Sequence, residues 1–133
     1  MSGLRSTLRR IPLAVDAYEL TSTRIRMRPT RGRVRQVLAS GKPIRLELGG
    51  GYVSGRAGYI NVDVTREADL FWDLRHGIPF PDASVAEVYS SHLLEHLTYA
   101  QGQVLLRECR RVLVPGGLLS VAVPNARLFL EAY

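Results

Sequence analysis

The stretch IRLELGGG, residues 44–51, decides the fold together with YINVDV, residues 59–64. Each is a short apolar run typical of a buried strand, and each carries an acid at or near its end, Glu47 in the first and Asp63 in the second. The first run then enters a glycine turn, where backbone N–H groups can approach a ligand closely. Open α/β sheets hold nucleoside-bearing cofactors in this way, with the acid of the second strand accepting both ribose hydroxyls. We therefore expect a cofactor pocket beside this turn.

Three further strands are predicted downstream, with a helix before the last of them. Strands are expected around residues 69–72, at 85–89 and at 118–123, the last one after a tight turn at 115–117. A helix is expected to begin at residues 93–97, to be interrupted near Thr98 and to resume over about 100–113, and its inward residues are expected to be Val104, Leu105, Cys109 and Val112. Strands that alternate with helices imply a largely parallel sheet.

The first crossover is predicted to be unusually short. Only seven residues lie between Gly51 and Tyr59. Because a helical crossover between parallel strands needs about a dozen residues or more, we expect a loop or a single turn there.

Length and composition indicate one domain of ordinary globular type. The chain has 133 residues, of which 46% are apolar and 23% charged. Its single cysteine, Cys109, excludes an internal disulfide and favours a reducing compartment. No window approaches the ~18 to 20 apolar residues of a membrane span. We therefore expect a cytoplasmic protein.

Charge is concentrated at the N-terminus. Residues 1–45 hold 11 basic and 2 acidic residues, a net charge of +9. Residues 46–133 hold 7 basic and 10 acidic residues, a net charge of −3, and the two sum to the overall +6. We expect residues 1–40 to be a basic arm, loose or partner-dependent up to about residue 29 and then a short helix from Thr30, its N-cap, to Ala39. Three interpretations of the arm stay open: a solvated segment, a contact with nucleic acid or another anionic partner, and docking on further parts of the fold.

Residues 44–125 resemble the core of a class I S-adenosylmethionine-dependent methyltransferase, in particular a bacterial subgroup with a shortened first crossover. Any one of the matching motifs is common by itself, but together they occur in the family's order. The matching stretches are Glu47 to Gly51, Asp63, Asp73 with Leu74, Ser90 to His92, and Arg111 to Gly117.

The resemblance implies a Rossmann-like α/β fold, with flanking helices on an open, mostly parallel sheet of strand order 3-2-1-4-5, formed by residues 41–133. It also implies S-adenosylmethionine as cofactor and a small molecule or a glycan as methyl acceptor. The implied cofactor contacts are Glu47, Gly49, Gly50 and Gly51 toward methionine and ribose, Asp63 at the ribose hydroxyls, Asp73 and Leu74 at the adenine, and Ser91 and His92 beside the methyl group. Methyl transfer is an in-line displacement that depends on positioning, and a histidine can serve it by deprotonating a hydroxyl or amine acceptor, so His92 is the candidate catalytic base.

Two departures from the family pattern stand out. Val53 takes the place of a further glycine in the longer form of the glycine motif, and the chain ends at Tyr133, just as a helix after strand five begins. The complete family fold has two more strands. We therefore expect an exposed apolar edge at strand five, which implies a truncated chain, a fragment gene or an edge covered by another copy.

The sequence also contains features of three other kinds of protein: a zinc peptidase, a non-catalytic module and a dehydrogenase. HLLEH, residues 92–96, has the form of a zinc-peptidase motif, but a third ligand would have to come from Glu108 or Glu131, so we expect no metal. The other interpretation of this motif is that Glu95 and His96 only make hydrogen bonds at the helix end and the adjoining loop. A non-catalytic methyltransferase-like module, acting through its basic arm or open edge, is the main alternative to an enzyme. A nicotinamide-dependent dehydrogenase is disfavoured because the glycine turn opens no helix for a pyrophosphate.

Overall fold

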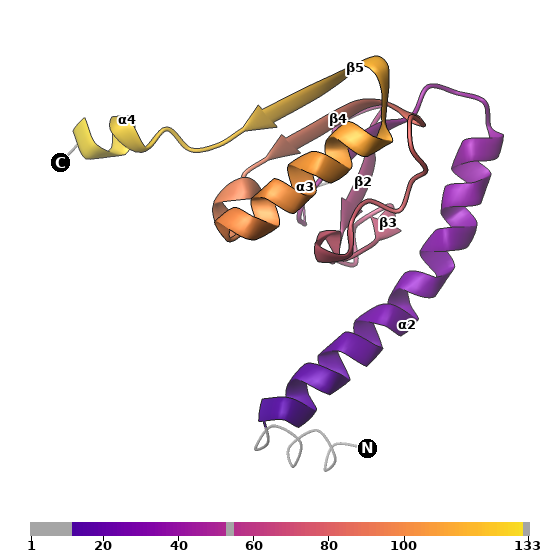
Figure 1. Ribbon diagram of the computed structural model, residues 1–133, viewed down its shortest axis with the longest axis horizontal. Coiled ribbons are helices and arrows are strands. Elements are labelled where there is room, and N and C mark those ends of the chain that lie inside the picture. The colour runs from indigo at the N-terminus through magenta and orange to yellow at the C-terminus, as the bar shows by residue number, and fades with distance from the viewer. Residues whose placement is uncertain (1–11, 53–54, 132–133) are drawn as a thin grey trace.

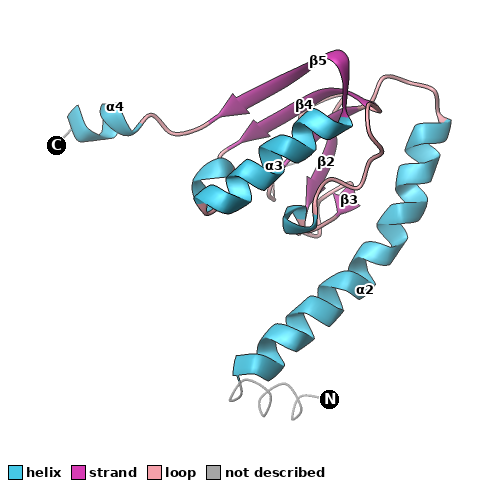
Figure 2. Cartoon of the chain, in the orientation of Figure 1, coloured by secondary structure: helices cyan, strands magenta, loops and turns pink. Residues whose placement is uncertain are grey.

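The computed structural model describes residues 12–52 and 55–131, which form an α/β sheet with helices packed beside it (Figure 1, Figure 2). The sheet has five strands in the order β3-β2-β1-β4-β5, and each adjacent pair is parallel. The predicted Rossmann-like architecture and strand order are confirmed. The strands are β1 (Arg45–Leu48), β2 (Ile60–Asp63), β3 (Leu70–Phe71), β4 (Val85–Ser91) and β5 (Leu113–Ala122).

The helix between β4 and β5 has the predicted interruption. A single 3-10 turn, η2 (Leu94–His96), is followed by α3 (Tyr99–Val112). Thr98 caps α3, since its side chain accepts from the N–H of Gln101 while the Gln101 side chain accepts from the N–H of Thr98. This reciprocal cap fixes where α3 begins and therefore where its first turn lies relative to the strand ends.

The core lies between the sheet and α3. Leu46, Leu48, Val62 and Val88 are almost fully buried on one sheet face, and Leu105, Cys109 and Val112 of α3 are buried as well. The prediction for these three helix residues is confirmed. Val104 was wrongly assigned to the same buried set, because its side chain remains 46% exposed.

The short first crossover lies against other residues of β1 and β2. Asn61 is 1% exposed, and its side-chain oxygen accepts a hydrogen bond from the N–H of Gly50 at 3.2 Å. Glu47 accepts from the backbone N–H of Arg56. A Cβ at Gly55 would lie 3.1 Å from both Asn61 Cβ and Glu47 Oε2, so a side chain there would require these neighbours to shift. The predicted loop thus replaces a crossover helix by packing its backbone on the strands.

β5 begins earlier than predicted. The tight turn expected at residues 115–117 lies inside the strand as an irregularity in its pairing with β4: Leu113 pairs with Val85, and Leu118 with Glu87. Gly117 permits this irregularity, because a Cβ there would lie 2.9 to 3.0 Å from two carbonyl oxygens. The strand therefore starts directly after α3, and α4 (Ala126–Glu131) follows it.

The N-terminal segment differs most from the prediction. A single helix, α2, spans Pro12–Ala39, so the expected loose segment up to residue 29 is wrong over residues 12–29, and Thr30 lies inside the helix instead of capping it. Residues 1–11 of the predicted arm lie outside the described part. Pro29 removes one helix hydrogen bond and would ordinarily interrupt a helix. Here Met27 and Thr30, on either side of it, are 6% and 3% exposed, and this packing offsets the loss.

α2 packs along the outer edge of β3 through side chains spaced three residues apart. The Thr30 hydroxyl donates to the carbonyl oxygen of Phe71 at 2.7 Å, and Arg33 donates to that of Asp69 at 2.7 Å. Met27 Sδ accepts from the N–H of Asp73 at 3.5 Å. These side chains occupy backbone groups of β3 that would otherwise have no strand to pair with.

Among the described helices, none is both long enough and apolar enough to cross a bilayer.

Candidate functional site

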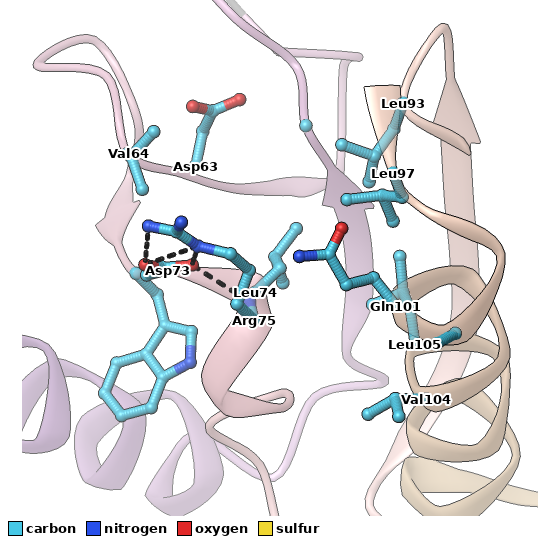
Figure 3. A pocket seen from close by; sticks show the side chains of 13 residues that line it. Asp63, Val64, Asp73, Leu74, Arg75, Leu93, Leu97, Gln101, Val104 and Leu105 are labelled. Carbon is cyan, nitrogen blue, oxygen red and sulfur yellow. Dashed lines mark hydrogen bonds and ion pairs between the residues drawn. The ribbon is translucent and has the colours of Figure 1, made fainter. Parts of the chain in front are cut away.

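A cavity of about 390 Å³ opens at the carboxyl ends of the strands. This volume falls within the range of small-molecule sites. Its walls come from the turn after β1, the ends of β2 and β3, η1 (Leu74–His76) and the first half of α3. Figure 3 shows the charged side chains of Asp63, Asp73 and Arg75 on one side and the leucines at 93 and 97 on the other.

Asp63 joins the glycine turn to the end of β2. Its Oδ2 accepts a hydrogen bond from the N–H of Gly51 at 3.0 Å, and its Oδ1 accepts one from the N–H of Thr65 at 3.0 Å. The Thr65 hydroxyl donates a hydrogen bond to the carbonyl oxygen of Gly51 at 2.9 Å. Because each carboxylate oxygen can accept more than one hydrogen bond, Asp63 is held in place at the cavity and still has acceptor capacity for a ligand.

The glycine turn is built for close approach. Gly49 has a φ of +73° and Gly51 a φ of +65°, a region that costs other residues energy. A Cβ at Gly49 would lie 2.9 Å from Leu93 Cδ1, and a Cβ at Gly50 would lie 2.7 Å from Asn61 Oδ1. The turn therefore exposes bare backbone to the cavity on one side and packs on Asn61 on the other.

Asp73 lies in the cavity wall, but its carboxylate is already engaged. Arg75 donates to it from Nε at 3.0 Å and from Nη2 at 2.7 Å, and the Arg75 N–H donates as well at 3.0 Å. Burial pushes the pKa of Asp73 upward, but the hydrogen bonds and charge of Arg75 outweigh it, and the net pKa is lowered. The Asp73 side chain is 5% exposed and that of Arg75 is 64% exposed, so the group presented to a ligand here is the guanidinium.

The opposite wall is apolar. It consists of one face of the segment from η2 into α3, with the amide of Gln101 as its polar group (Figure 3). The lining residues of this wall are Leu93, Leu97, Ala100, Gln101, Val104 and Leu105.

His92 follows the last residue of β4 and has an unusual backbone conformation. Its φ is +53°, in the left-handed region that non-glycine residues rarely adopt. Its N–H donates to the carbonyl oxygen of Ala122 at 3.1 Å, and its Nδ1 lies 3.0 Å from Glu95 Oε1. The side chain is 68% exposed. Strain of this kind often persists at functional sites, where the surrounding structure imposes it.

Arg111 of α3 fixes the irregular loop that leads into β4. It donates to the carbonyl oxygens of Ile78 at 3.0 Å and Phe80 at 2.9 Å, and it pairs with Glu108 and Asp82. Glu108 in turn accepts from the N–H of Ile78 at 2.9 Å. The hydrogen bond from Arg111 is the largest influence on Glu108 and lowers its pKa despite partial burial. This network joins α3 to the loop that follows the cavity wall.

The structure brings some of the predicted site residues together and places others elsewhere. Gly49, Asp63, Asp73 and Leu74 line the one cavity described above. Gly50 and Gly51 shape its turn through their hydrogen bonds, whereas Glu47 is bound by the crossover loop. Ser91 and His92 lie at the end of β4, beside Leu93 of the cavity wall.

Sequence reasoning missed Arg75 and most of the α3 wall. A signal for the wall was available, since residues 101, 104 and 105 share one helix face. Arg75 carries no such periodic signal, because its role depends on the 3-10 turn that folds it back onto Asp73.

The two histidines of the HLLEH motif do not share a helix. His92 precedes the 3-10 turn η2, and His96 ends it. Within the described ranges, no group of three or more His, Cys, Asp or Glu side chains gathers as a metal ion would require.

Part of this chain is similar in sequence to known proteins. A family model described as "Methyltransferase domain" matches residues 61–121. This match shows that residues 61–121 are similar to the methyltransferase-domain family. A protein of Mycolicibacterium smegmatis, named as a probable S-adenosylmethionine-dependent methyltransferase, is 46% identical over 61 residues. That alignment covers 43% of this chain and 23% of the relative, so the chain spans about a quarter of the relative's length. The class I methyltransferase resemblance of the sequence motifs is confirmed.

The residues present fit an adenosyl group of the kind that S-adenosylmethionine carries. Asp63 keeps free acceptor capacity at the cavity, and the absence of a Cβ at Gly49 lets the backbone of the turn approach Leu93 of the cavity wall closely. In the described residues between β1 and β2, 49–52 and 55–59, no helix follows the glycine turn, so these residues offer no helix N-terminus to a diphosphate. The donor set therefore suits an adenosyl ligand without a diphosphate.

Proposed function

We propose that this chain carries the cofactor-binding part of an S-adenosylmethionine-dependent methyltransferase. The observation that carries the proposal is the placement of Asp63, Gly49 and Asp73 around one cavity at the carboxyl ends of parallel strands. Ligands of open α/β sheets bind at this position. When bound, S-adenosylmethionine supplies an electrophilic methyl group on its sulfonium sulfur.

Each wall would have a distinct task. Asp63, oriented by Gly51 and Thr65, would accept the ribose hydroxyls. The adenine would lie between the Arg75 guanidinium and the apolar face of α3. Glu47, Gly50 and Ser91 complete the proposed contacts, with Glu47 acting through the loop that it holds.

Calorimetry with S-adenosylhomocysteine tests this assignment without knowledge of the acceptor. We expect micromolar to submillimolar affinity, in the ordinary range of small-molecule sites, and a loss of at least tenfold in Asp63→Ala. Glu67→Ala is the matched control, since it removes an exposed acid a few residues further along the chain and should change the affinity less than twofold. A folded wild-type sample that binds no S-adenosylhomocysteine would refute the assignment.

His92 is proposed as the base that deprotonates the acceptor. In the tautomer that donates from Nδ1 to Glu95, its Nε2 is left as a proton acceptor. Transfer of a labelled methyl group from S-adenosylmethionine to a pool of small molecules and glycans should fall by about 10² to 10⁴ in His92→Ala, with S-adenosylhomocysteine affinity unchanged. Equal transfer by the variant and the wild type would remove His92 from the mechanism.

The exposed edge of β5 supports a second candidate, a methyltransferase-like module that acts by association. Leu118 and Val121 of this edge strand are 56% and 41% exposed, and Val123, just after it, is 54% exposed. Such an edge favours pairing with another chain, here a second copy. Sedimentation should then show a dimer that forms with increasing concentration and is lost in Val121→Lys; a monomer at all concentrations would exclude this.

A further inference from the structure

The structure divides the arginines of α2 into two groups. Arg26 lies 4.0 Å from the centroid of the Phe71 ring, and Arg33 donates to the carbonyl oxygen of Asp69. These two cations are engaged with the edge of the sheet. Arg28, Arg31 and Arg35 are exposed, and among the residues whose side chains the structure describes, none provides an acidic partner for these three.

Arg28, Arg31 and Arg35 lie along one side of the helix. Steps of three and four residues in a helix of 3.6 residues per turn keep side chains on one face, and the rise of about 1.5 Å per residue spreads these three over about 10 Å. No Asp or Glu occurs between residues 24 and 39. We call these three residues the arginine strip. Its positive charge is uncompensated within this part of the helix.

We propose that the arginine strip is a docking surface for the phosphate backbone of a nucleic acid duplex. Guanidinium groups match phosphate oxygens in a planar, bidentate geometry that an ammonium cannot provide. A duplex carries about one negative charge per 1.7 Å of axis, so three cations spread over about 10 Å find phosphates within reach. The strip lacks the aromatic side chains on which single-stranded bases stack, which favours a duplex over a single strand.

The same helix face is poorly suited to a lipid surface. Interfacial helices bury a continuous apolar face in the headgroup region. Met27 and Val34, the apolar residues on either side of the strip's centre, are each 6% exposed because they pack toward the sheet. Ile25 is the exposed large apolar residue of this stretch, at 63%. One such side chain does not form an apolar face. Exposed arginines without an adjoining apolar face favour a phosphate polymer over a lipid surface.

The strip has a defined position relative to the cavity. Arg33, Thr30 and Met27 contact Asp69, Phe71 and Asp73 respectively, so α2 runs antiparallel to β3 and its N-terminal half passes the carboxyl end of that strand (Figure 1). Arg28 is thus the member of the strip nearest the cavity end of the sheet. The docking surface is independent of the proposed methyl transfer, since it requires neither cofactor nor acceptor.

Fluorescence anisotropy with labelled 25-base-pair DNA and RNA duplexes tests the surface. For the wild type, we expect binding at 50 mM salt that weakens as salt is raised. The triple variant R28A/R31A/R35A should bind at least tenfold more weakly at 50 mM salt, and its slope of log K against log salt should be shallower by about 2.7, or 0.9 per phosphate contact. The control R107A/R110A/R127A removes the same charge from exposed positions outside α2 and should change the affinity less than twofold.

Three outcomes would overturn the proposal. They are no duplex binding by the wild type at 50 mM salt, equal weakening in the two triple variants, and strip-dependent binding to phosphatidylserine vesicles without duplex binding. Circular dichroism verifies that both variants keep their helices, which we expect because alanine has a higher helix propensity than arginine. Failure of S-adenosylhomocysteine to bind would count against the proposed function and would leave the anisotropy result intact.

Discussion

The backbone N–H of Gly51 donates a hydrogen bond to Oδ2 of Asp63 across 3.0 Å, and this bond links the ends of two neighbouring parallel strands. The same carboxylate receives the N–H of Thr65 through its other oxygen. One side chain therefore sets the shape of the glycine turn, closes the end of β2 and faces the cavity. Effects on stability and on ligand binding should be coupled at this residue.

Asp63→Asn tests that coupling. An amide in place of the carboxylate would turn a donor toward either Gly51 or Thr65, leaving one N–H without an acceptor. We expect the free energy of unfolding to fall by about 1 to 3 kcal/mol and S-adenosylhomocysteine to bind more weakly. Urea denaturation and calorimetry on one sample measure both quantities. A change in affinity with unaltered stability would show that the two bonds to the backbone contribute little.

Arg75 should contribute to ligand binding although it is not one of the predicted contacts. Its guanidinium is held at the cavity by Asp73 and can lie over an aromatic base. Such a contact is worth about 0.5 to 2 kcal/mol, so Arg75→Ala should weaken S-adenosylhomocysteine binding by about 2- to 30-fold. Arg75→Lys, which keeps the charge but loses the planar fork, should recover only part of this. Wild-type affinity in Arg75→Ala would place the adenine elsewhere.

The network around Arg111 should dominate the stability of the loop that precedes β4. Removing this side chain leaves Glu108 without its main partner and two carbonyl oxygens without donors. We expect Arg111→Ala to lower the free energy of unfolding by about 2 to 4 kcal/mol. The neighbouring Arg110→Ala, at an exposed position, should change it by less than about 0.5 kcal/mol. Similar denaturation midpoints for the two variants would contradict this role.

Acid should destabilise the protein partly through Asp73. Because its pKa is lower in the folded state than in the unfolded chain, the carboxylate contributes stability above its ordinary pKa of about 4, and this contribution is lost as the pH falls through the lowered folded value. Asp73→Asn should therefore be less stable at pH 7 and show a shallower decline in stability between pH 5 and pH 2. Denaturation at a series of pH values measures this. Parallel curves would show that the Asp73–Arg75 pair has no net effect.

Cys109 should be chemically inert in the folded protein. Burial, with a further contribution from the charge of Glu108, raises the pKa of its thiol to about 11. Little thiolate is present at pH 8, and the side chain is 2% exposed. Ellman's reagent should react slowly with native protein at pH 8 and rapidly after guanidinium is added. Rapid reaction of the native thiol would indicate that α3 opens readily.

The sequence predicted the elements whose signal is local. Alternating strands and helices, the break at Thr98 and the acids at the strand ends follow from short patterns of residues, and the parallel sheet follows from them. The register irregularity in β5 could not be predicted in the same way, because Pro-Gly-Gly favours a turn and the outcome depends on how Leu113 and Leu118 pair with β4.

α2 and Arg75 show why the rest was harder to predict. A proline and a run of arginines argue locally against a long helix, and the helix is supported by tertiary contacts of Met27 and Thr30 with β3. Likewise, Asp73 was expected to face the ligand, and only the folded chain shows that Arg75 takes up its carboxylate. For α2 a partner that is distant in sequence outweighs the local pattern, and for Asp73 the backbone conformation of the 3-10 turn does so.

The contacts of α2 with β3 limit how the edge of the sheet can pair with another molecule. Thr30, Arg33 and Met27 use the outward backbone groups of β3 as partners, much as a neighbouring strand would. Strand addition by a foreign chain, the usual beginning of edge-to-edge aggregation, is thereby blocked on this flank. Within the described residues, pairing of the sheet with another chain is therefore left to the β5 flank.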